Sequence, residues 1–104
     1  TGFARTGENA GEMARLFGFL EFHPYDSRRS TPGFPDCTFV HPTAGRLLFR
    51  ELKTAVGRVT VSQQAWLDAL ASAGQDVGVW RPEQLYDGTI ERELRVSKWA
   101  RSTT

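Results

Sequence analysis

Two carboxylates and a lysine stand in two apolar runs that a short loop joins. Asp36 opens the first run, residues 36–41, and Glu51 and Lys53 lie near the end of the second, residues 46–53. The Pro-Thr-Ala-Gly loop between them is typical of a β-hairpin. If the hairpin is centred on the middle of this loop, Asp36 lies directly opposite Glu51. Such opposed side chains have Cβ atoms about 4.5–5.5 Å apart, where two like charges repel. A fold that holds this pair therefore needs a cation beside it.

Lys53 and a divalent metal ion are the two candidates for that cation. Alternation along the strand sends Glu51 and Lys53 to one face of the sheet and Leu52 to the other, so Lys53 can neutralise part of the charge. A metal with hard oxygen ligands does so better. Asp36, Glu51 and the main-chain carbonyl of Leu52 would leave positions on a magnesium ion for water and a phosphate oxygen. Such a site suits metal-assisted hydrolysis, in which Lys53 positions the water or steadies developing charge.

The same residues also have a simpler interpretation. A Glu-Leu-Lys tripeptide is common and often marks a strand end with solvated charges. Asp36, which follows Pro35, could cap a turn. The residues alone leave both interpretations open.

The elements that must position these residues follow from the periodicity and the turn residues. Gly18 is expected to end a helix that buries Met13, Leu16 and Phe17, and Thr60 to Gln63 fits a capping box. Trp66, Leu67 and Leu70 give the next helix its apolar face. In chain order we predict a helix over 8–17, strands over 19–23, 36–41 and 46–53, a helix from the capping box to Gly74, a strand over 77–80, and short helical pieces over 82–86 and 90–99.

This order, α-β-β-β-α-β, predicts an α/β fold with a mixed central sheet flanked by helices. A helical crossover allows the last strand to run parallel to an earlier one. Both hairpin strands carry apolar residues on both faces, so helices are expected to cover each face. The chain has 104 residues, which suits a single domain over 1–104.

The composition excludes several classes of protein. One cysteine excludes an internal disulfide and, with two histidines, disfavours a structural zinc site. A net charge of +1 gives no overall attraction to nucleic acid, so DNA binding must rely on local basic patches. No apolar run reaches the roughly 20 residues of a membrane helix. We therefore expect a soluble, cytoplasmic protein that does not bind a membrane.

The order of these motifs resembles the VRR-NUC family of the PD-(D/E)XK nuclease superfamily, in particular its small stand-alone members from bacteriophages and bacteria. The resemblance covers about residues 14–94. It includes "FHPYDSRRSTPGFPD", then "ELK", "TVSQ" and "GVWRP" in the same order. This is far more specific than an Asp and a Glu-x-Lys alone.

The resemblance implies a restriction-endonuclease-like core and an endonuclease that depends on Mg²⁺ or Mn²⁺. On the matching positions it makes Asp36 and Glu51 metal ligands, Lys53 the catalytic lysine and Gln63 a further catalytic residue. Such families often supply another acid from the first helix, for which Glu8 and Glu12 are the candidates.

Basic and hydroxyl side chains near Asp36 are the expected DNA contacts. A basic loop with hydroxyl groups beside a metal site suits phosphate contacts better than base reading. The candidates are His23, Ser27, Arg28, Arg29, Ser30 and Arg58.

The leading hypothesis is a metal-dependent DNA endonuclease, selective for branched or Holliday-junction DNA. Cutting both strands with one site per chain would need a homodimer, which is most simply two-fold symmetric. If the gene belongs to a phage, the protein would act in the cytoplasm of its bacterial host. The alternatives are a nicking, restriction-type or mobile-element-associated nuclease, and a DNA-binding module that keeps the fold without the chemistry.

Overall fold

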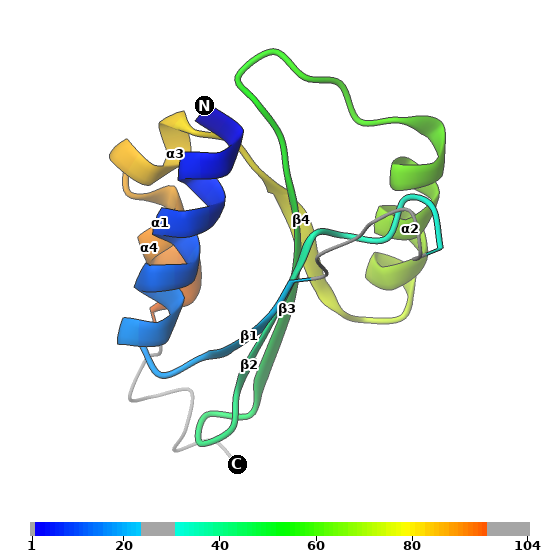
Figure 1. Ribbon diagram of the computed structural model, residues 1–104. Coiled ribbons are helices and arrows are strands. Elements are labelled where there is room, and N and C mark those ends of the chain that lie inside the picture. Colours follow the sequence, from blue (N-terminus) through cyan, green and yellow to red (C-terminus); the bar gives the residue numbers. More distant parts are fainter. Residues whose placement is uncertain (1, 24–30, 96–104) are drawn as a thin grey trace.

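Four strands form one mixed sheet with helices on both faces (Figure 1). The structure is a computed structural model, which describes residues 2–23 and 31–95. The observed elements are α1 (Gly2–Leu16), β1 (Leu20–Phe22), β2 (Cys37–His41), β3 (Arg46–Leu52), α2 (Val61–Ser72), β4 (Asp76–Trp80), α3 (Glu83–Tyr86) and α4 (Thr89–Leu94). The predicted fold class and the α-β-β-β-α-β order are confirmed.

The sheet has the strand order β1-β2-β3-β4. The first three strands pair antiparallel as a meander, and β4 pairs parallel to β3 after the crossover through α2. Figure 1 shows α1, α3 and α4 on one face of the sheet and α2 on the other. The predicted parallel pairing of the last strand is therefore confirmed.

The main core lies between the sheet and the layer formed by α1 and α4. Its fully or almost fully buried residues include Phe39, Leu48, Leu52 and Trp80 from the sheet and Ile90 and Leu94 from α4. Cys37 is also buried there, as expected, and burial raises the pKa of its thiol. Within the described residues, no helix combines the length and apolar character that crossing a bilayer requires.

Helix α1 corrects the predicted helix in two ways. It begins at Gly2 rather than at residue 8. The sequence did not indicate this earlier start, because the glycine-containing stretch before residue 8 carries no apolar periodicity. Its inward face is built on Ala10 and Ala14, whereas Leu16 is 86% exposed. Met13 and Phe17 are partly buried and pack against the core as expected, so Leu16 is the one predicted residue of this face that points away from it. Gly18, with a φ of 95°, ends the helix as expected.

The C-terminal helical pieces are shorter than predicted. Helix α4 ends at Leu94, and Arg95 already has extended backbone. Residues 96–99 of the predicted piece lie outside the described part of the chain.

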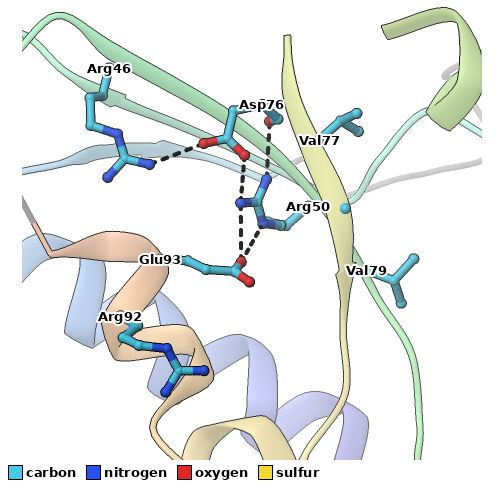
Figure 2. A pocket seen from close by; sticks show the side chains of 8 residues that line it. Arg46, Arg50, Asp76, Val77, Val79, Arg92 and Glu93 are labelled. Atoms are coloured by element: carbon cyan, nitrogen blue, oxygen red, sulfur yellow. Dashed lines mark hydrogen bonds and ion pairs between the residues drawn. The ribbon is translucent and has the colours of Figure 1, made fainter. Parts of the chain in front are cut away.

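A buried arginine ties the edge strand β4 to α4. Arg50 is 4% exposed and lies over the Trp80 ring, 5.2 Å from its centroid. Its guanidinium donates to Asp76 Oδ1 at 2.7 Å and to Glu93 Oε1 at 3.2 Å (Figure 2). Trp80 Nε1 donates to the same Glu93 oxygen at 2.7 Å. Two main-chain carbonyls, of Phe49 and Asp76, also accept hydrogen bonds from it. These bonds compensate the buried charge.

Asp76 reports on the same network. Burial raises the pKa of its carboxyl, but hydrogen bonds and charge from Arg50 and Arg46 outweigh this and bring the pKa below its ordinary value. A neighbouring hollow of about 430 Å³ is lined by Arg46, Arg50, Asp76, Val77, Gly78, Val79, Arg92 and Glu93. The buried Arg50 in this lining is fully paired, which indicates a structural role.

Replacing Arg50 should therefore destabilise the fold strongly. R50M leaves Glu93 and Asp76 without their buried cation, and we expect a loss near the lower end of roughly 3–5 kcal/mol in the free energy of unfolding. Urea titration measures it. The matched control R46M removes a more exposed partner of Asp76 and should cost about 0–1 kcal/mol. Equal losses in the two variants would contradict a structural role for the buried network.

Candidate active site

The hairpin pairs in the predicted register. The paired residues run from His41 opposite Arg46 to Cys37 opposite Arg50, so one step further sets Asp36 against Glu51. Main-chain pairing stops at Cys37, and beyond it the side chain of Asp36 bonds to the neighbouring strand instead. Its Oδ2 accepts a hydrogen bond from the main-chain N–H of Leu52 at 2.9 Å. Asp36 is thus fastened to the strand that carries Glu51.

Glu51 is a buried carboxylate, and one of its oxygens has no partner in the part of the chain that the structure describes. The residue is 3% exposed. Its Oε2 accepts from Gln63 Nε2 at 2.8 Å and lies 3.7 Å from Lys53 Nζ. Its Oε1 is buried and has no hydrogen-bond partner in the described structure. Burial, followed by the charge of Asp36, raises the pKa of Glu51 to about 7, although Lys53 acts in the opposite direction.

Gln63 links the start of α2 to this carboxylate. Its Oε1 accepts from the Thr60 N–H at 2.9 Å, and its own N–H donates to Thr60 Oγ1 at 3.2 Å, which completes the predicted capping box. Its Nε2 is then left to donate to Glu51. One amide therefore caps the helix and holds one carboxylate oxygen.

The segment before Asp36 packs against the same helix end. Gly33 has a φ of 91°, and a Cβ there would come within 2.5 Å of the Ser62 main chain. Phe34 packs edge-to-face on Trp66 and on Phe49, with ring centroids 5.0 and 5.9 Å away. Only glycine permits this approach, so the chain enters Asp36 along a fixed path.

One cleft of about 310 Å³ brings most of the predicted residues together. The side chain of Leu52 belongs to the core, so its main chain is the part that faces the cleft. Thr54 and Gly57 were not predicted as site residues; their position directly after the Glu-x-Lys strand was the available signal. The lining consists of Asp36, Glu51, Leu52, Lys53, Thr54, Gly57, Arg58 and Gln63.

Other predicted site residues lie elsewhere. Glu8 and Glu12 are exposed and do not line the cleft. They lie on the side of α1 opposite Ala10 and Ala14, which face the sheet. No group of three or more His, Cys, Asp or Glu residues within the described chain is placed to share a metal ion.

The expected DNA contacts are divided in the same way. Arg58 lies at the cleft, whereas His23, after β1, is exposed away from its lining. Ser27, Arg28, Arg29 and Ser30 lie outside the described residues.

The fold and the cleft define an α/β domain that presents a carboxylate pair and a lysine beside one helix end. The sequence model of the VRR-NUC domain matches residues 7–84. The chain therefore belongs to the VRR-NUC family, which is a family of nuclease domains.

A solved structure described as a VRR-NUC domain shares the fold. It superposes with a TM-score of 0.69 over 85% of this chain and 94% of that one, at 21% sequence identity. A search of curated proteins gave no match.

The raised pKa of Glu51 predicts how stability depends on pH. The folded state holds the Glu51 proton more tightly than the unfolded state. The contribution of this proton to the free energy of unfolding is therefore complete below about pH 4.5 and is lost as the pH rises through about 7. Each pH unit between the folded-state and unfolded-state pKa values corresponds to about 1.4 kcal/mol. E51Q has no proton to lose. In metal-free buffer we expect the free energy of unfolding of the wild type to fall relative to that of E51Q as the pH rises from about 5 to about 8. Parallel pH profiles of the two proteins would disprove this.

Proposed function

We propose that this chain is a metal-dependent DNA endonuclease that hydrolyses phosphodiester bonds and uses Mg²⁺ or Mn²⁺. The observation that carries the proposal is the buried Glu51 carboxylate, whose Oε1 has no partner in the described structure and which lies beside a second carboxylate, Asp36. A buried charge without a full set of partners is costly, so such sites are kept where a cation or a reaction requires them. Membership of a nuclease family supports the reaction.

The donor atoms of the cleft suit a hard divalent cation. Asp36, Glu51 and the Leu52 carbonyl would hold it through oxygen atoms, the ligands that Mg²⁺ and Mn²⁺ prefer. Because the described cleft offers no third acidic side chain, water and phosphate oxygens would complete the shell. When bound, the ion would polarise a phosphoryl oxygen and lower the pKa of a water molecule. That Glu8 or Glu12 supplies a further ligand stays a prediction.

The chain's own residues divide the remaining work. Gln63 fixes Oε2 of Glu51, which leaves Oε1 available to the cation. The Lys53 ammonium, 3.7 Å from the same carboxylate, is placed to stabilise negative charge that develops on the phosphate or the attacking water. Arg58 at the cleft contacts the phosphate backbone, which positions DNA without reading its sequence.

We further propose that the substrate is branched or Holliday-junction DNA and that a homodimer cuts it. The resemblance to small stand-alone members supports the substrate. The dimer is supported by an exposed apolar surface on the α2 side of the sheet, where the register aligns residues of three strands. These residues are Leu20 and Phe22 of β1, Val40 of β2 and Leu47 of β3. Contiguous exposed apolar residues commonly mark contacts between proteins.

Cleavage assays test the proposal. With Mn²⁺ or Mg²⁺, the purified protein should cut a four-way junction faster than linear duplex or plasmid DNA. D36N and E51Q should lower the rate by about a hundredfold or more, because each replaces a charged carboxylate ligand with a neutral amide. K53M should lower it while leaving DNA affinity close to that of the wild type.

The matched control is D68N, which removes a carboxylate of α2 that accepts a hydrogen bond from Gln64 and lies outside the cleft lining. It should cut at the wild-type rate. If no substrate is cut but DNA binding falls steeply with salt, the chain is a DNA-binding module. Preferential nicking of a linear sequence would instead favour the restriction-type or mobile-element-associated alternative.

A further inference from the structure

The segment between β3 and α2 lies at the cleft and has little hydrogen bonding of its own. Residues 53–59 contribute Lys53, Thr54, Gly57 and Arg58 to the lining. In the described structure, no hydrogen bond between main-chain groups involves residues 54–59. Val56 in this segment is 89% exposed. The path of the segment therefore depends on side chains from elsewhere.

Arg81 supplies those contacts. Its Nη1 donates to the main-chain carbonyl of Thr54 at 2.8 Å and to that of Gly57 at 2.8 Å. Hydrogen bonds from a charged donor are shorter and stronger than neutral ones, and one guanidinium nitrogen here joins both ends of the turn. A Cβ on Gly57 would come 2.8 Å from Thr54 Oγ1, so the turn is tightly folded at this point.

The backbone of Arg81 is itself well fixed. It follows Trp80, the last residue of β4, whose carbonyl accepts from the Lys53 N–H at 3.0 Å. The Arg81 N–H donates to Gln84 Oε1 at 2.8 Å, at the start of α3. Arg81 therefore reaches the cleft segment from a rigid part of the fold.

We propose that Arg81 is a positioning residue of the nuclease site, which holds residues 54–58 so that Arg58 stays beside the carboxylate pair. The proposal rests on the proposed function for its effect on DNA. Arg81 acts through main-chain carbonyls and does not line the cleft. Because Lys53 is held separately by its bond to Trp80, loss of Arg81 should release Arg58 more than Lys53.

Two readouts test the proposal, and the first is independent of activity. A nitroxide label on V56C reports the mobility of the segment by electron paramagnetic resonance. Cys37 is buried, so it does not compete for the label. R81M should narrow the spectrum. R81K should narrow it less, because an ammonium keeps the charge but lacks the fork of the guanidinium. R46M, which removes an arginine that does not line the cleft, should leave it unchanged.

The second readout is steady-state cleavage of DNA by the same variants without the label. R81M should raise KM about tenfold, the effect of losing roughly one charged contact with phosphate, and change kcat by less than about threefold. R81K should raise KM less than R81M does. If R81M does not fold, R81K carries both readouts.

The outcomes separate the two proposals. An unchanged spectrum in R81M overturns the positioning role, as does a mobile segment with an unchanged KM. If R81M makes the segment mobile but the wild-type protein cuts no DNA, the positioning of the segment by Arg81 stands and the nuclease assignment is overturned.

Discussion

The burial of Glu51 beside Asp36 is the constraint on which the site depends. Two carboxylates at neighbouring positions repel, and only one oxygen of Glu51 is hydrogen-bonded to Gln63. The surrounding structure holds this unfavourable arrangement in place. The hairpin register fixes Asp36, and the first turn of α2 fixes Gln63. The fold thus gives up some stability to keep a geometry that a cation would favour.

Arg50 and Glu51 are consecutive residues of β3 whose side chains lie on opposite faces of the sheet. Both are buried and charged, and alternation sends Arg50 toward α4 and Glu51 toward α2. Arg50 is compensated by two carboxylates and two carbonyls, so it stabilises the fold. Oε1 of Glu51 has no hydrogen-bond partner among the described residues. The difference in compensation, rather than in burial, distinguishes the structural charge from the candidate ligand.

Local rules were enough to predict the hairpin register and the capping box, because loop length and turn residues decide them. They also predicted that Asp36, Glu51 and Lys53 lie together, and the family resemblance added Gln63; all four line one cleft. The central place of Ala10 and Ala14 in the buried face of α1, and the exposure of Leu16, could not be predicted, since they depend on how closely the helix approaches the sheet. For the same reason Glu8 and Glu12 could not be placed. Arg50 gave no local signal, because its partners come from β4 and α4.

The most direct test is a crystal structure of the protein soaked in Mn²⁺, with diffraction collected to locate the metal by its anomalous scattering. We predict one strong peak within bonding distance of Asp36 and of the Glu51 oxygen that Gln63 leaves unpaired. In E51Q crystals treated in the same way the peak should be absent. A wild-type crystal at about pH 8, where Glu51 is ionised, with no peak between these carboxylates would contradict the role of the pair as a metal site.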